Sequence, residues 1–206
     1  MLAQLKFQDK ELQHKVEEAM YDVYVVQMGN LFKEITCITD EPPLAWGNTN
    51  TRQWYKDNDF LAGYSISYND LVEDPTPVRW IRFRPNHRWS KHDILASLYH
   101  KLGHHLHFTC ECIQEIFDDN WAAAMKQIEN SGTYQGYGLR AYSFTNVKEF
   151  FSDIFSFYIM GKDYFTHWKT RYGNLIAILK KHGIDFADLM SQVKVQIGRN
   201  DHSWPS

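Results

Sequence analysis

Two histidines one helical turn apart are the residues of this chain best suited to chemistry. His100 and His104 are four positions apart, and residues four apart on an α-helix lie on the same face, so both imidazoles can bind one metal ion. In metal-dependent hydrolysis by such a pair, a glutamate directly after the first histidine takes a proton from the attacking water. That position holds Lys101, a cation. The segment therefore predicts two metal ligands and a missing general base.

A histidine pair alone is weak support for a metal site, because a chain with 10 histidines produces this spacing by chance. A hydrolytic zinc site needs a third protein ligand and keeps one position open. Glu149 is the candidate third ligand, since Glu149 and Asp153 share one face of an otherwise aromatic helix. Asn146 and Glu149 also fit a pair of residues that begins a helix, which is the structural alternative for this glutamate.

With these residues in place, the chain resembles the zinc metallopeptidases that include anthrax lethal factor and the Pro-Pro endopeptidases. In that group an H-E-x-x-H helix is followed by a helix whose E-F-F-[AS]-[ED] segment supplies the third ligand, and a tyrosine seven residues earlier assists the oxyanion. This chain reads E-F-F-S-D at residues 149–153, and Glu149 follows His104 by 45 residues and Tyr142 by seven. The resemblance is strongest over residues 60–160, and its departure is Lys101.

The resemblance implies a role for each matched residue. His100, His104 and Glu149 would bind one zinc ion. Tyr142 would donate its hydroxyl to the charge that develops on the scissile carbonyl oxygen. Asp153, one turn beyond the glutamate, would orient a ligand histidine.

The resemblance also implies a substrate groove, and two of its roles have plainer alternatives. The strand that contains Gly63, Tyr64 and Ser65 would be an edge strand against which an extended peptide adds. Tyr142 has the alternative of packing alone, and Asp153 that of a solvated side chain.

Lys101 separates two hypotheses for function. Zinc with two neutral histidines and one carboxylate carries a charge of about +1, and an ammonium about 4 Å away at an effective dielectric of about 20 is repelled by about 4 kcal/mol. Three outcomes would relieve this repulsion: the lysine turns to solvent, it loses its proton, or zinc binds weakly or not at all. We favour the turn to solvent, because the methylenes of lysine are flexible.

The first hypothesis is a pseudopeptidase, which keeps the groove and acts by binding a peptide or protein, because loss of a general base costs about 10² to 10⁴ in rate. The alternative is an active zinc endopeptidase of the toxin type, or a catalytically disabled variant of one.

Apolar periodicity predicts a single α+β domain over residues 1–206, mostly helical, with a small sheet beside the motif helix and, by the resemblance, a zincin-like fold. Ser90 and Asp93 predict the start of the motif helix, and Gly161 and Gly183 predict helix ends. The expected helices are 8–35, the motif helix, and about 113–129, 146–160, 167–182 and 184–196, and the expected strands are 60–68 and 78–84.

The composition of the chain indicates which kinds of partner and which cellular location to expect. The net charge is −3, from 22 basic and 25 acidic residues, so there is no electrostatic argument for nucleic acid or an anionic membrane. No apolar run reaches the roughly 18 residues of a membrane span. The N-terminus is polar, without a secretion signal, which predicts a cytoplasmic protein, although a secreted chain trimmed of its signal would look the same. The three cysteines predict isolated thiols.

Overall fold

The computed structural model describes residues 3–23, 32, 34–41, 62–67, 78–85, 87–118, 120–130, 139, 141–164 and 168–197. These residues form helices and a small mixed sheet, which confirms the α+β class. The chain divides into two compact units, Met1–Lys101 with Ser203–Ser206, and Leu102–His202, and the boundary falls inside helix α3 (Lys91–Thr109). A single zincin-like domain stays a prediction.

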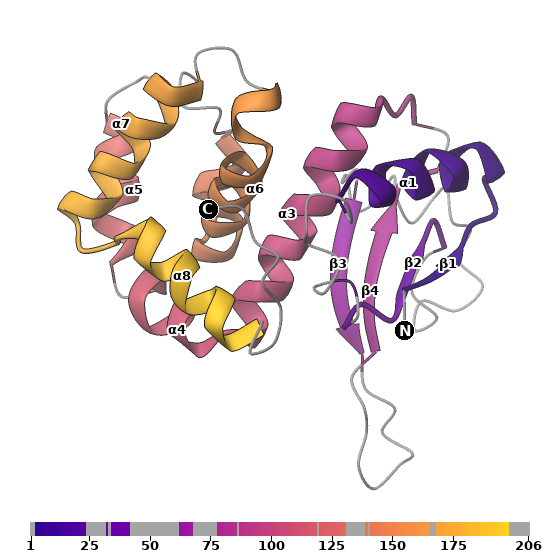
Figure 1. Ribbon diagram of the computed structural model, residues 1–206, viewed down its shortest axis with the longest axis horizontal. Coiled ribbons are helices and arrows are strands. Elements are labelled where there is room, and N and C mark those ends of the chain that lie inside the picture. Colours follow the sequence, from indigo (N-terminus) through magenta and orange to yellow (C-terminus); the bar gives the residue numbers. More distant parts are fainter. Residues whose placement is uncertain are drawn as a thin grey trace, which may run out of the picture. The chain divides into compact units, whose positions relative to one another are not determined.

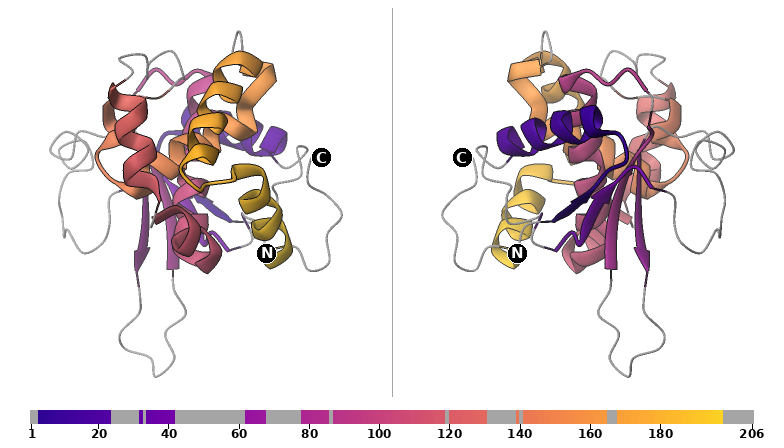
Figure 2. Two further views of the ribbon diagram at one scale, coloured as in Figure 1. Left: turned by 90° about the vertical axis from the view of Figure 1, so that its left-hand side faces the viewer. Right: turned by 90° about the vertical axis from the view of Figure 1, so that its right-hand side faces the viewer.

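The sheet of the first unit has the order β1-β2-β4-β3 (Figure 1). Its strands are β1 (Gln4–Lys6), β2 (Cys37–Thr39), β3 (Ala62–Ser67) and β4 (Val78–Phe83). The first two and β4 run parallel, whereas β3 is antiparallel to β4. The pair β3 and β4 is the longest part of the sheet (Figure 2). Because β3 is the last strand in this order, it is an edge strand in the described part of the chain.

Helix α1 (Lys10–Val23) joins the first unit through its apolar face and its N-terminus. Leu12, Val16 and Ala19, at helical spacing, are buried. Asp9 caps the helix, because its Oδ1 accepts the Leu12 amide at 3.0 Å. The buried carboxylate of Asp40, directly after β2, accepts two backbone amides just before the helix, each at 2.9 Å. The end of β2 thus fixes where α1 begins.

The second unit is built around an aromatic core on α6. Its elements are α4 (Glu111–Ile113), the π-helix η4 (Gln114–Asp118), α5 (Trp121–Asn130), the 3-10 helix η6 (Ala141–Phe144), α6 (Val147–Tyr164), α7 (Trp168–Lys181) and α8 (Phe186–Ile197). Helices α5, α6 and α7 contact one another, and α8 contacts α4 (Figure 1). Phe151 of α6 packs its ring against Phe117, Phe155 and Phe186, with ring centroids 5.2 to 6.1 Å apart.

Several expected element boundaries are wrong. The helix expected over 8–35 is described over Lys10–Val23, its part over 24–31 lies outside the described residues, and residues 34 and 35 are not helical. Strands β1 and β2 were not expected. The helix expected over 113–129 begins earlier and is interrupted before Trp121. Gly161 lies within α6 and does not end it. Gly183 ends α7 as expected, with a φ of 86° that glycine adopts without strain.

Two further findings concern the whole described chain. Cys37, Cys110 and Cys112 are buried and form no disulfide, in agreement with the predicted isolated thiols. Across the described ranges, every helix is too short or too polar to cross a membrane.

The start of α3 carries a reciprocal pair of hydrogen bonds, as expected. Ser90 Oγ accepts the Asp93 amide at 3.1 Å and donates to Asp93 Oδ2 at 2.6 Å, and the same carboxylate accepts the Ser90 amide at 3.2 Å. The hydrogen bond from Ser90 lowers the pKa of Asp93. The pair fixes the register of the helix that carries both histidines.

Replacing this cap tests its contribution to stability. We expect Ser90→Ala to lower the free energy of unfolding by about 1 kcal/mol at neutral pH in urea titrations. Because the folded pKa of Asp93 is depressed, its contribution is present above the unfolded pKa of about 3.9 and disappears as pH falls through the folded pKa, so the loss should shrink toward about pH 3. Ser191→Ala, on an exposed position of α8, should cost nothing. Equal losses for the two variants would contradict the cap.

Candidate metal centre

His100, His104 and Glu149 come together in the structure. Their ligand atoms all lie within 4.8 Å of one another, and all three residues are buried. Among the described residues, no other group of three histidines, cysteines or acids meets this distance criterion. The two histidines come from successive turns of α3, and the glutamate comes from the first turn of α6. The three predicted ligands therefore form one cluster.

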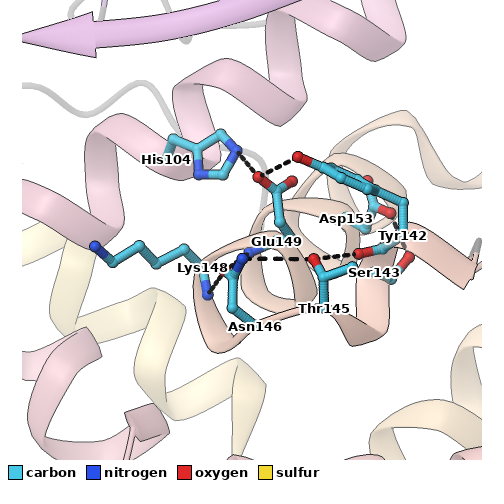
Figure 3. A network of polar contacts seen from close by, with 8 residues as sticks. All are labelled: His104, Tyr142, Ser143, Thr145, Asn146, Lys148, Glu149 and Asp153. Atoms are coloured by element: carbon cyan, nitrogen blue, oxygen red, sulfur yellow. Dashed lines mark hydrogen bonds and ion pairs between the residues drawn. The ribbon is translucent and has the colours of Figure 1, made fainter. Parts of the chain in front are cut away.

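The chemistry of this cluster suits zinc. Two imidazole nitrogens and one carboxylate are the donor set of hydrolytic zinc sites, which keep a further position for water or substrate. Ligands about 2.1 Å from a tetrahedral zinc lie about 3.4 Å apart. His104 Nε2 and Glu149 Oε1 are 3.3 Å apart (Figure 3). This pair therefore already has the separation that a shared ion requires.

A glycine in the motif allows α3 and α6 to approach closely enough for this contact. A Cβ atom at Gly103 would lie 2.7 Å from the Ser152 Cα and 3.1 Å from the Ser152 Cβ, so any side chain there collides with α6. Gly103 directly precedes His104, and Ser152 lies one turn after Glu149. This close approach of the two helices therefore lies beside the three clustered residues.

At the start of α6, Asn146 caps the helix, and the Glu149 carboxylate faces the histidine cluster. Asn146 Oδ1 accepts the backbone amides of Lys148 and Glu149 at 3.0 and 3.1 Å, which caps the helix. The Glu149 carboxylate contacts His104 and Tyr142 (Figure 3). The sequence left open a helix-start pair of Asn146 and Glu149, and the hydrogen bond from the Glu149 amide to the Asn146 side chain is one half of that pair.

The Tyr142 hydroxyl lies at the cluster. It donates to Glu149 Oε1 at 3.2 Å, and the residue is 54% exposed. The buried carboxylate of Asp153 accepts a short hydrogen bond from Ser143 Oγ, next in the chain to Tyr142. Asp153 thereby anchors the η6 segment that carries the tyrosine. That it also orients a ligand histidine stays a prediction, and the anchoring role of Ser143 was missed.

The remaining predicted site residues occupy expected elements. Lys101 is half-buried on α3, directly after His100. Gly63, Tyr64 and Ser65 lie on the edge strand β3 and pair with β4. Their role as a substrate groove stays a prediction.

The neighbouring His107 has a structural role. Its Nε2 lies 2.8 Å from Asp118 Oδ1, and its backbone oxygen accepts the Gln114 side chain at 2.9 Å. It therefore ties α3 to η4.

No protein-family model matches this chain, and neither does any curated protein or solved structure.

The close approach at Gly103 generates a direct test. We expect Gly103→Ala to push α3 and α6 apart, to lower stability by at least the 1 to 3 kcal/mol typical of overpacking, and to weaken zinc binding. Gly173→Ala on α7 is the matched control, because a Cβ there meets nothing within 4 Å. It should raise stability by up to about 1 kcal/mol. Urea unfolding and zinc titration measure both quantities, and unchanged zinc affinity in Gly103→Ala would contradict the geometric role.

Proposed function

We propose that this chain is a zinc-binding domain of the lethal-factor and Pro-Pro endopeptidase type that binds a peptide or protein and has lost most or all hydrolytic activity. The observation that carries the proposal is the buried group of His100, His104 and Glu149 within 4.8 Å. Two observations support it: the two histidines and one carboxylate are the ligands typical of hydrolytic zinc, and the histidines have the spacing that the motif requires.

The described residues around the cluster could bind a peptide carbonyl group but do not include the usual group that activates water. Zinc, when bound, supplies a Lewis acid that polarises a carbonyl oxygen and lowers the pKa of a coordinated water. The Tyr142 hydroxyl donates a hydrogen bond to the Glu149 carboxylate. At this position it can instead donate to a peptide carbonyl oxygen and stabilise the charge on it. Lys101 offers no carboxylate to accept a proton. The chain therefore has groups that hold a peptide carbonyl but lacks the usual group that activates water.

The edge strand β3 is the proposed groove for the peptide. A strand at the edge of a sheet has backbone N–H and C=O groups available for pairing with an extended chain. Gly63, Tyr64 and Ser65 lie on this strand. A peptide added there would be held by backbone hydrogen bonds, with specificity coming from side-chain pockets.

Zinc content is the first test of the proposal. We expect purified protein to bind about one zinc ion per chain. Loss of a residue that only hydrogen-bonds to a metal ligand weakens metal binding about 10- to 100-fold, so loss of the ligand itself in Glu149→Ala should weaken zinc binding by more than that. Zinc at 100 times its Kd should raise the unfolding free energy by about 2.7 kcal/mol. Glu129→Ala, an exposed position on α5, is the control and should bind zinc like the parent. Absence of zinc binding, or a Glu149→Ala variant that binds like the parent, overturns the site.

Restoring the carboxylate tests the loss of activity. We expect Lys101→Glu to raise cleavage of quenched fluorescent peptides by roughly 10² to 10⁴, because it supplies a general base. Lys101→Gln is the matched control: it removes the ammonium without adding a base, so it should bind zinc more tightly and still cleave nothing. Cleavage by the parent chain at a comparable rate would instead establish an active endopeptidase. Absence of cleavage in all three proteins would favour a domain that only binds.

A further inference from the structure

Exposed aromatic side chains are concentrated at the candidate metal centre. Three large hydrophobic residues of the described chain are exposed: Tyr21, Phe108 and Tyr142. Tyr142 donates to the ligand Glu149. Phe108, 43% exposed, follows the ligand His104 by one turn of α3, which places their Cβ atoms about 6 Å apart. Exposed aromatic surface thus borders the cluster at both η6 and α3.

A lysine covers the aromatic ring on α3. Lys148 Nζ lies 4.4 Å from the centroid of the Phe108 ring. Lys148 is exposed and directly precedes Glu149, and Figure 3 shows its side chain extending away from the Glu149 carboxylate. Within the described ranges, no carboxylate lies at ion-pair distance from this ammonium. Its side-chain contact there is the ring, which leaves the three N–H donors available to a ligand.

The position of Lys148 is unfavourable for its own helix. It occupies the first turn of α6, where the amide dipoles favour negative charge and disfavour a cation. Its ammonium instead contacts the last turn of α3, where a cation is favoured. A residue that conflicts with its local element is expected where function requires it. If Lys148 serves only to connect α6 to α3, its replacement should lower stability without changing peptide selectivity, so stability measurements distinguish the two roles.

We propose that Lys148 and Phe108 form a subsite that binds a carboxylate of the peptide held at the metal centre. The ammonium pairs with the carboxylate, and the exposed ring packs on the methylene groups beside it. The subsite rests on the proposed function, since it requires a peptide at His104 and Glu149. The carboxylate comes from an acidic side chain or from the C-terminus of the peptide, and the two sources are chemically alike at the ammonium.

Peptide selection tests the subsite. The zinc-loaded protein is used to select binders from two random peptide libraries, one with free and one with amidated C-termini. We expect enrichment of Asp or Glu at one position in both libraries if a side chain supplies the carboxylate, or binders in the free-acid library alone if the terminus does. Selected peptides should bind Lys148→Glu about 3- to 10-fold more weakly, as expected for reversal of a partly exposed charge.

Matched variants separate the subsite from general effects. Lys126→Glu makes the same charge reversal on the exposed face of α5 and should leave peptide affinity unchanged. A peptide with its acidic residue changed to the amide should bind Lys148→Glu and the parent equally. Phe108→Ala should weaken binding of the acidic and amide peptides alike. Zinc affinity of Lys148→Glu should not fall below that of the parent, because Lys148 is not a ligand and replacing a nearby cation with an anion favours a bound dication.

Two failures have different meanings. Peptides bound without preference for a carboxylate, or an affinity unchanged in Lys148→Glu, would overturn the subsite and leave the proposed function standing. A stability loss in Lys148→Glu with no change in peptide selectivity would assign Lys148 the structural role alone. Zinc-loaded protein that binds no peptide from either library would overturn peptide binding itself, and with it the subsite.

Discussion

The close packing of α3 against α6 at Gly103 is the constraint on which the candidate metal centre depends. Two histidines on one helix can present only one side of a metal site, and the third ligand must come from a neighbour at short range. A backbone without a side chain at Gly103 lets Ser152 lie at a distance that a Cβ would not tolerate. Glu149 then meets His104 at 3.3 Å. One missing side chain thus permits the geometry of the site.

The aromatic core holds α6 in its place beside α3. Phe150, Phe151 and Phe155 of α6 are fully buried, and the rings of Phe150 and Phe151 contact rings from neighbouring elements. An interior packed at this density resists small displacements, since each lost contact weakens the van der Waals attraction. The polar face of the same helix carries Glu149 and Asp153. A helix held by its aromatic residues therefore presents its acids in fixed positions.

The pairing of His100 with His104 could be predicted from the sequence because its geometry is local, whereas Glu149, 45 residues beyond His104, was joined to the pair by the family resemblance. Positions four apart on a helix share a face whatever the rest of the fold does, and this rule connects His100 with His104 and Glu149 with Asp153. The cap of Ser90 and Asp93 could be predicted for the same reason, as a short-range pattern.

Other features depend on contacts that no short pattern encodes. Strands β1 and β2 have three residues each, too few for alternation to be visible, and they form because neighbouring strands pair with them. The link from Ser143 to Asp153 joins a 3-10 turn to a helix across ten residues. The contact of Lys148 with Phe108 joins segments 40 residues apart and required the arrangement of α3 and α6.

The buried thiols have a practical consequence for following the two units separately. Burial raises the pKa of Cys37 in β2 and of Cys112 in α4, so little reactive thiolate is present in the folded protein. Each thiol then reacts with an alkylating reagent mainly when its own surroundings open. Cys37 belongs to the first unit, and Cys112 belongs to the second together with another buried thiol, Cys110. Alkylation at Cys37 and at Cys112 therefore reports local opening in different units.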